Sequence, residues 1–219
     1  MIDFDGMITK YIKKEFRPRG IGKYYPSDAG MCMRKVWYSY MYPSEVEPEL
    51  AKIFELGNII HDFIVKVLKS EKNREIVLLG SELPVRQNID GIEISGRVDD
   101  VIKVCIDNKV YLVEVKSTKS LFYTNDAKSH NVDQLQLYMH LTGIHDGIIL
   151  YVDKTNLQTK AFKISYDPGA ANEIIERFKK LHSHLLEKTL PPPEAKLIQK
   201  NAWMCKYCEY QDKCLKNES

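Results

Sequence analysis

The sequence lacks the features that mark membrane-spanning, exported or ATP-driven proteins. No apolar run approaches the roughly 20 residues that a transmembrane helix needs. The first residues, Met1-Ile2-Asp3-Phe4-Asp5, contain early acids and no apolar stretch, so they do not resemble a signal peptide. A Gly-x4-Gly-Lys-Ser/Thr loop is also missing, which argues against an ATP-driven motor. We therefore expect a cytoplasmic protein that does not act at a membrane.

Internal repeats and low-complexity segments are absent, and the 219 residues carry a net charge of only +2. A charge this small does not by itself indicate nucleic-acid binding, but it is unevenly distributed. Residues 1–40 have eight Lys/Arg against four Asp/Glu, and residues 195–219 have five against three. Two basic ends would form a phosphate-binding patch if the fold joined them. A solvated basic surface explains the same distribution equally well.

The chain is long enough to bury a core of its own, and its 44% hydrophobic share is ordinary for a globular domain. Residue periodicity and turn signals predict an α/β fold with a helical N-terminal cover. Helices are expected over 7–16, 28–41, 49–69, 126–142 and 168–188, and strands over 76–89, 92–106, 109–116, 147–153 and 158–165. We divide this one compact domain into an N-terminal helical segment (1–48), a core (49–190) and a cysteine-bearing tail (191–219).

Two acidic motifs lie on strands that are predicted to pair. One reads Gly-Arg-Val-Asp and ends at Asp99, and the other reads Glu-Val-Lys and begins at Glu114. A hairpin turn at residues 107–108 would set Asp99 opposite Lys116. Opposed residues share a face of a sheet, as do residues two apart on one strand. Asp99, Glu114 and Lys116 should therefore project from one side of the sheet, with Asp100 on the other.

Two carboxylates and an ammonium on one face suit a site for a divalent cation. Hard oxygen ligands favour Mg²⁺ or Mn²⁺, which polarise a phosphoryl oxygen and lower the pKa of bound water. Lys116 would then orient that water or stabilise charge in the transition state. A surface salt bridge between Glu114 and Lys116 is the simpler explanation of the same spacing. The apolar neighbours of these residues make a fully solvated strand the poorer match.

Two predicted helices add polar side chains. His61 shares a helical stripe with Ile64, so it should point inward. An inward histidine is usually a satisfied core residue, but beside a carboxylate pair it is a candidate metal ligand. Gln134 and Tyr138 stand four apart on one helical face and are candidates for hydrogen bonds to a phosphate, a base or a metal-bound water. Ordinary surface polarity of the helix is the alternative.

Taken in order, these motifs resemble those of the RecB-type branch of PD-(D/E)xK nucleases. The motifs are Gly57-x3-His61, Gly96-x2-Asp99, Glu114-x-Lys116 and Gln134-x3-Tyr138. The resemblance implies a restriction-endonuclease-like mixed sheet flanked by helices. It implies that the metal is held by His61, Asp99, Glu114 and the carbonyl of Val115. Catalysis is assigned to Lys116, Glu114 and Asp99, and we predict DNA contacts from Gln134, Tyr138, Arg97 and Arg34.

Four of the five cysteines form a second pattern. Cys205, Cys208 and Cys214 cluster in the tail, and Cys32 stands alone near the other end. In a reducing cytosol such cysteines indicate metal binding more than disulfides, and a Cys-x2-Cys pair chelates one centre. Cys32 is the candidate fourth ligand, since Cys105 falls within a predicted strand as a small buried thiol.

Zinc and an iron–sulfur cluster both accept four thiolates. Zinc sites usually come as two local pairs, whereas here one ligand is remote and the last spacing is five residues, which favours an iron–sulfur cluster. We expect this group to clamp the two ends of the chain together. A redox role is the alternative to this structural one.

Cys32 is followed by Arg34 and the aromatic pair Trp37-Tyr38, and three cysteines follow the RecB-like core. This arrangement, from about Cys32 to Cys214, resembles the CRISPR-associated RecB-like nucleases of the Cas-four type, relatives of AddB and exonuclease V. The resemblance implies a [4Fe–4S] or [2Fe–2S] cluster, Mn²⁺ or Mg²⁺, and exonucleolytic cleavage of single-stranded DNA. It also implies a role in prespacer processing beside the integrase Cas-one.

Two other functions fit the same residues. A non-catalytic adaptor would bind DNA ends or an integrase and retain the nuclease fold as a scaffold. The intact Asp99, Glu114 and Lys116 argue against such a degenerate site. A RecB-like repair nuclease outside CRISPR would use the same chemistry, and the residue pattern does not separate it from the first interpretation.

Overall fold

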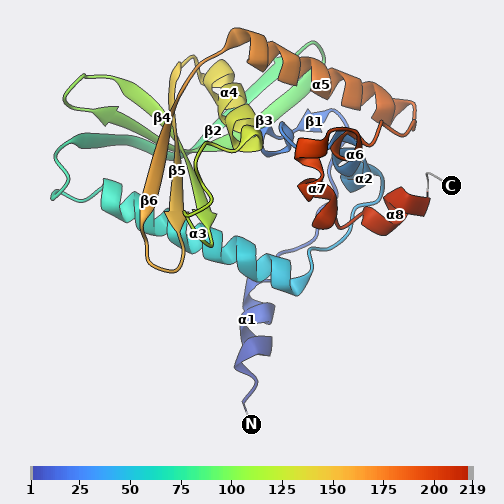
Figure 1. Ribbon diagram of the computed structural model, residues 1–219, viewed down its shortest axis with the longest axis horizontal. Coiled ribbons are helices and arrows are strands. Elements are labelled where there is room, and N and C mark those ends of the chain that lie inside the picture. The colour runs from blue at the N-terminus through green and yellow to red at the C-terminus, as the bar shows by residue number, and fades with distance from the viewer. Residues whose placement is uncertain (1, 217–219) are drawn as a thin grey trace.

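The computed structural model, which describes residues 2–216, contains a six-stranded mixed sheet with helices on both faces (Figure 1). The strands are β1 (Lys23–Tyr24), β2 (Ile76–Ile89), β3 (Ile92–Val104), β4 (Val110–Thr118), β5 (Asp146–Asp153) and β6 (Thr159–Ser165). Their order is β1-β3-β4-β5-β6, and β2 also pairs with β3. The β4–β5 and β1–β3 pairs are parallel and the others antiparallel. The predicted mixed α/β fold is confirmed.

The helices largely match the predicted spans but differ at the N-terminal end. They are α1 (Phe4–Ile12), α2 (Met33–Met41), α3 (Pro48–Leu68), α4 (Ser129–Thr142), α5 (Pro168–Leu186), α6 (Glu194–Leu197), α7 (Trp203–Lys206) and α8 (Gln211–Lys216), with 3₁₀ turns at Pro26–Asp28 and Gln199–Asn201. The expected helix over 28–41 is split, so α2 begins only at Met33. The break carries Gly30 against α4, where an added Cβ would lie 2.2 Å from the Cα of His130.

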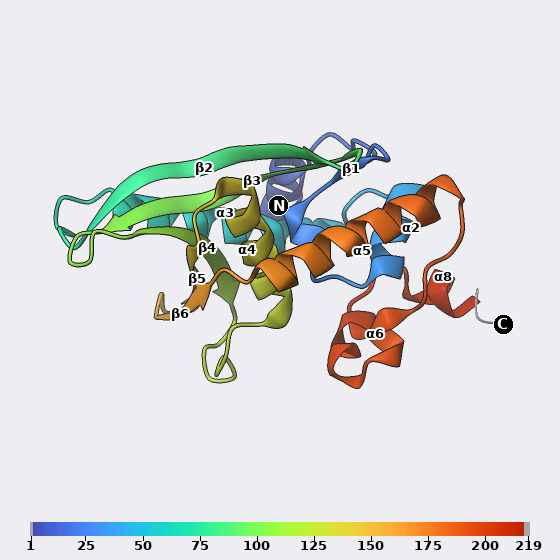
Figure 2. The same cartoon turned by 90° about the horizontal axis from the view of Figure 1, so that it is seen from above.

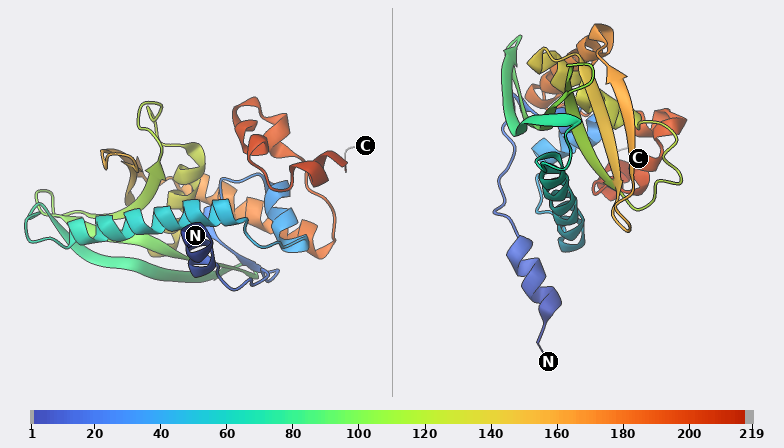
Figure 3. Two further views of the ribbon diagram at one scale, coloured as in Figure 1. Left: turned by 90° about the horizontal axis from the view of Figure 1, so that it is seen from below. Right: turned by 90° about the vertical axis from the view of Figure 1, so that its left-hand side faces the viewer.

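Opposite faces of the sheet pack against different helices. Ile60 and Ile64 of α3 pack with Val152 of β5 on one face. Leu135 of α4 packs with Leu112 of β4 on the other. Because residues of β4 alternate between faces, Glu114 lies on the side of α4. Figure 3 shows α3 running across the opposite side of the sheet.

The β3–β4 hairpin has a different register from the predicted one. Val101 pairs with Leu112, whereas the expected turn at residues 107–108 would have set it opposite Glu114. The connection is longer than expected, since Val104 N–H donates to the carbonyl of Lys109 at 2.9 Å. A shift of two residues preserves the alternation, so the predicted common face of Asp99 and Glu114 survives.

Cys105 was expected to be buried in a strand, but it is exposed because it begins this longer turn. Its backbone N–H donates to the carbonyl of Glu75 at 2.9 Å, so the turn is tied to the segment before β2. Its place at the far end of the hairpin separates it from the other four cysteines. The choice of Cys32 over Cys105 as a partner of the tail is therefore consistent with the fold.

The two ends of the chain meet at α2. Lys35 of α2 pairs with Glu209 at 3.0 Å, and the ring of Tyr38 stacks on that of Tyr210 with centroids 5.5 Å apart. Helices α6 to α8 lie beside α2 in Figures 1 and 2, whereas α1 projects away from the sheet. Among the described residues, no helix is both long enough and apolar enough to span a membrane.

Candidate active site and cysteine pocket

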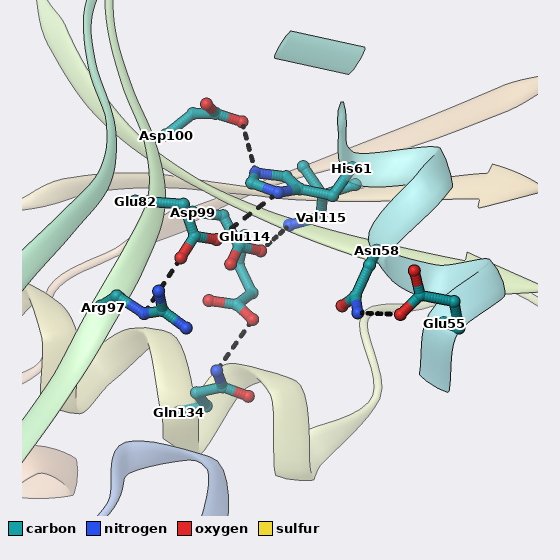
Figure 4. A network of polar contacts seen from close by, with 10 residues as sticks. All are labelled: Glu55, Asn58, His61, Glu82, Arg97, Asp99, Asp100, Glu114, Val115 and Gln134. Atoms are coloured by element: carbon teal, nitrogen blue, oxygen red, sulfur yellow. Dashed lines mark hydrogen bonds and ion pairs between the residues drawn. The ribbon is translucent and has the colours of Figure 1, made fainter. Parts of the chain in front are cut away.

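The sheet opens at Asp99, and this opening forms the candidate active site (Figure 4). Paired residues of β3 and β4 end at Asp100 and Val113. Beyond them, the Oδ2 atom of Asp99 accepts the backbone N–H of Val115 at 2.8 Å, so a side chain replaces a strand partner. On the other edge of β3, Glu82 of β2 has a φ of 53° and leaves the ladder. Asp99 therefore lies where both neighbouring strands deviate.

Three side chains meet at this opening from three elements. His61 of α3, Glu82 of β2 and Asp99 of β3 each offer a ligand atom within 4.8 Å of the others. Nδ1 of His61 lies 3.5 Å from Oε1 of Glu82, and Nε of Arg97 lies 3.0 Å from the other oxygen of Glu82. An imidazole and two carboxylates are a donor set that suits a divalent ion such as Mn²⁺.

A second group consists of Glu114, Lys116 and Gln134. Lys116 Nζ lies 2.7 Å from Oε1 of Glu114 and donates to the side-chain oxygen of Gln134 at 3.0 Å. Gln134 Nε2 donates to the same Oε1 of Glu114 at 2.8 Å. The other oxygen of Glu114 is buried and has no hydrogen-bond partner among the described residues. A buried carboxylate with one unpaired oxygen retains the capacity to bind a cation.

The pKa values of these groups reflect the burial and crowding of their charges. Burial, reinforced by the charge of Glu114, raises the pKa of Asp99 to about 8. Burial also raises the pKa of Glu114. Burial lowers the pKa of Lys116, but the charge and hydrogen bond of Glu114 and the charge of Asp99 outweigh it, so that the pKa is raised. A divalent cation would favour the ionised carboxylates and so release their protons.

Asp100 supports His61 from the other face of the sheet. Its side chain is fully buried, and neither of its oxygens has a hydrogen-bond partner among the described residues. Oδ2 of Asp100 lies 3.4 Å from Nε2 of His61, and this carboxylate is the main cause that raises the pKa of His61 to about 9. A carboxylate beside one ring nitrogen orients the imidazole and directs the other nitrogen toward a metal. Here that other nitrogen is Nδ1, on the side of Glu82.

Sequence reasoning missed Glu82 and Asp100 as site residues. Asp100 was placed on the opposite face, which is correct, but α3 covers that face and brings His61 to it. Glu82 stands between Gly80 and Pro84, where the sequence predicts an interrupted strand. That interruption was the available signal, because a residue released from the ladder can turn its side chain toward a site.

The predicted DNA contacts differ in exposure. Arg97 has a largely exposed side chain beside Glu82, whereas Arg34, Gln134 and Tyr138 are buried. Tyr138 packs in the core beneath Gly96, where an added Cβ would lie 2.8 Å from the tyrosine hydroxyl. Gly96 thus allows β3 to approach α4 closely. Of the four residues, Arg97 alone offers a surface to DNA in this conformation, and the DNA contacts stay a prediction.

The four cysteines of the second pattern line one pocket between α2 and the tail. They are Cys32, Cys205, Cys208 and Cys214. Arg34 joins them, since its Nη1 donates to Sγ of Cys214 at 3.5 Å and its Nε donates to the carbonyl of Pro191 at 2.7 Å. Burial raises the pKa of the Cys208 thiol. None of the cysteines forms a disulfide within the described chain. The pocket therefore offers four sulfur ligands beside the buried guanidinium of Arg34.

The fold and the motifs agree with known nucleases. The family model described as the PD-(D/E)XK nuclease superfamily matches residues 31–215. No curated protein matches the chain. Among solved structures, the crystal structure of SSO0001 is similar, with a TM-score of 0.65 and 22% identity over 95% of this chain and 94% of that one.

Two exonuclease structures share the fold at lower identity. LHK-Exo, an alkaline exonuclease from Laribacter hongkongensis solved with dAMP, has a TM-score of 0.56 and 15% identity over 77% of this chain and 90% of its own. A phage-related exonuclease from Haemophilus somnus 129PT has a TM-score of 0.52 and 14% identity over 83% of this chain and 99% of its own. The family match spans Asp99, Glu114 and Lys116, and the chain belongs to the PD-(D/E)XK nuclease superfamily.

Proposed function

We propose that this protein is a metal-dependent DNA exonuclease that acts on single-stranded DNA or on overhangs. The observation that carries the proposal is the meeting of His61, Glu82 and Asp99 at one opening of the sheet. Beside them lies Glu114, whose charge acts on Asp99 and whose carboxylate holds Lys116. Oε2 of Glu114 is buried without a hydrogen-bond partner among the described residues, which fits a carboxylate that binds a cation. Exonuclease structures among the similar folds support cleavage from an end.

Each residue has a distinct part in the proposed reaction. His61, Asp99, Glu114 and the carbonyl of Val115 would hold Mn²⁺ or Mg²⁺, and Glu82 adds a carboxylate beside them. When bound, such an ion supplies Lewis acidity that polarises the phosphodiester and lowers the pKa of a coordinated water. The chain's own contribution is then geometric and electrostatic.

Lys116 is fixed at 2.7 Å from Glu114 and 3.0 Å from Gln134, so its ammonium is already placed before substrate arrives. A preplaced cation stabilises the negative charge that develops on the phosphoryl oxygens without reorganising in the reaction. The same ammonium is a donor that can orient the attacking water. Gln134 therefore acts by positioning Lys116 and Glu114.

The activity can be tested with end-labelled single-stranded DNA and added Mn²⁺ or Mg²⁺. Wild-type protein should degrade the strand, and Glu114→Ala should not. Lys66→Ala, which removes an exposed lysine of α3, is a matched control for Lys116→Ala and should retain wild-type rates. Absence of cleavage with every divalent metal would favour the adaptor that binds DNA ends or an integrase.

We further propose that the cysteine pocket holds a [4Fe–4S] cluster, with [2Fe–2S] or zinc as the alternatives. The convergence of Cys32, Cys205, Cys208 and Cys214 on one pocket supports four thiolate ligands. The guanidinium of Arg34 suits the negative charge of such a cluster. Purified protein should be brown with broad visible absorbance and contain iron. A colourless preparation with stoichiometric zinc would replace the cluster by a zinc site.

A role in CRISPR spacer acquisition is the most specific part of the proposal. It rests on the pairing of the cysteine pattern with the nuclease motifs, as in nucleases of the Cas-four type. The test is whether the protein trims prespacer overhangs and binds the integrase Cas-one of the same organism. Trimming without any binding or stimulation by that integrase would favour a RecB-like repair nuclease outside CRISPR.

A further inference from the structure

The connection between β4 and α4 carries two adjacent aromatic side chains in solvent. Phe122 is 79% exposed and Tyr123 is 84% exposed. Their neighbours lie inside, since Thr124 is 3% exposed and Leu121 packs against the core on the side of α4. Thr124 N–H donates to the carbonyl of Leu121 at 3.0 Å, which closes a four-residue turn. The two aromatic residues are the central pair of that turn.

The pair has a defined geometry. The ring centroids of Phe122 and Tyr123 lie 4.9 Å apart with an interplanar angle of 85°. An edge-to-face arrangement leaves at least one face of each ring open. The base of the turn is held by Phe122 N–H, which donates to Oγ of Ser120 at 3.2 Å, and by Thr118, whose hydroxyl donates to the carbonyl of Ser120 at 3.1 Å. These hydrogen bonds and the one between Thr124 and Leu121 close the turn, and none of them involves either ring.

The turn lies between two elements of the candidate active site. It follows β4, which carries Lys116, and precedes α4, which carries Gln134. Six positions separate Lys116 from Phe122, so even a fully extended chain would keep their Cα atoms within roughly 20 Å of each other. Figures 2 and 3 show this connection projecting on the same side of the molecule as α6 and α7. A strand bound at the site can therefore reach the turn.

The charges around the turn suit a polyanion. Lys119 and Lys128 are exposed at its two ends, and Asp126 is the acid of this connection. Flat apolar rings flanked by lysines match a nucleic acid strand, in which bases supply stacking faces and phosphates supply charge. A purely apolar protein partner would not need the flanking cations.

We propose that Phe122 and Tyr123 form a base-stacking site for the unpaired end of the nucleic acid substrate. This inference rests on the proposed function, since it requires a single strand at the active site. Every base has a π-face, so the site binds unpaired bases without selecting a sequence. A paired base is less accessible because its faces are covered by its neighbours in the duplex. The turn thus favours single-stranded ends.

The test measures binding by full-length protein carrying Lys116→Ala, which retains the candidate metal ligands and should cleave about 10²- to 10³-fold more slowly than wild type. Fluorescence anisotropy with Mn²⁺ compares a labelled single strand with a strand of the same length that contains abasic sites. Adding Phe122→Ala and Tyr123→Ala should weaken binding of the normal strand by roughly 5- to 150-fold per lost stack. The double substitution should also abolish the preference for the normal strand over the abasic one.

Two controls separate stacking from damage to the fold. In the same Lys116→Ala parent, Phe122→Tyr with Tyr123→Phe keeps both rings and should bind the normal strand as tightly as the parent does. Tyr11→Ala removes a tyrosine of α1 that is 87% exposed and should change nothing. Unchanged binding after both alanine substitutions, or an equal loss for normal and abasic strands, would overturn the stacking site. If the Lys116→Ala parent binds neither strand, the proposed DNA function itself fails, which is a separate result.

Discussion

The active-site opening and the cysteine pocket are built in opposite ways. Asp99, Glu114 and Lys116 lie on long strands of the central sheet, and hydrogen bonds fix them before any ligand binds. The cysteines of the tail lie on or beside short helices, and α8 contains no buried residue. In the first region the fold positions the ligands, whereas in the second we expect the bound group to position the chain. Substitutions should therefore affect chemistry in one region and stability in the other.

The largest effect is expected on catalysis when the active-site opening is altered. Lys116→Ala should lower the rate of Mn²⁺-dependent DNA cleavage by about 10²- to 10³-fold, because a preplaced charge is lost from the transition state. Mn²⁺ binding should persist, since the carboxylates and His61 remain. A melting curve close to that of wild type would accompany this loss. If Lys116→Ala lost its fold together with its activity, the proposed difference between the two regions would be contradicted.

The reverse pattern is expected for Cys205→Ser. Removing one of four proposed ligands should bleach the visible absorbance, lower the melting temperature and open residues 191–216 to proteolysis. Cys105→Ser is the matched control, because Cys105 is exposed in the β3–β4 turn and should have no such effect. Retention of full thermal stability in Cys205→Ser would contradict the clamp.

A smaller effect is expected when Asp100 is replaced by the isosteric asparagine. Asp100→Asn should weaken Mn²⁺ binding by about 10- to 100-fold, because His61 loses the carboxylate that orients its ring. Calorimetric titration with Mn²⁺ measures this directly. Asp62→Asn, at an exposed position of α3 next to His61, should leave the affinity unchanged. Equal affinities in wild type and Asp100→Asn would remove Asp100 from the site.

The smallest expected effect is a dependence of metal binding on pH. The raised pKa values of Asp99, about 8, and His61, about 9, mean that both groups carry protons near neutral pH in the metal-free protein. A metal must displace these protons, so its affinity should increase from pH 6 to pH 9. The metal-free protein should become less stable over the same interval, because the folded state binds more protons than the unfolded state.

The increase in melting temperature on adding Mn²⁺ should therefore be larger at pH 9 than at pH 6. The cysteine pocket serves as the comparison, since its ligands belong to another region and Cys205→Ser should leave this pH trend intact. A metal-induced shift that is constant over this range would mean that Asp99 and His61 do not exchange protons for metal.

The local sequence pattern was sufficient to predict most helices and strands and the shared sheet face of Asp99 and Glu114. Alternation along a strand is a property of consecutive residues, so Asp99 and Glu114 share a face even though the predicted register was two residues off. The register itself depends on the turn, where Asn108 adopts a positive φ of 59° and the connection lengthens. The length of this turn is set by backbone conformation and cannot be predicted from the residue types alone.

By itself, the sequence determined which chemical groups are present and in what order, because motifs at fixed spacings on strands and helices keep their relative directions. It placed Asp99, Glu114 and Lys116 together and singled out four of the five cysteines. Only the tertiary structure decided that His61 lies between Asp100 on one side and Glu82 with Asp99 on the other. That position depends on how α3 packs across the sheet and on where β2 leaves its ladder, and both are long-range contacts that no local pattern encodes.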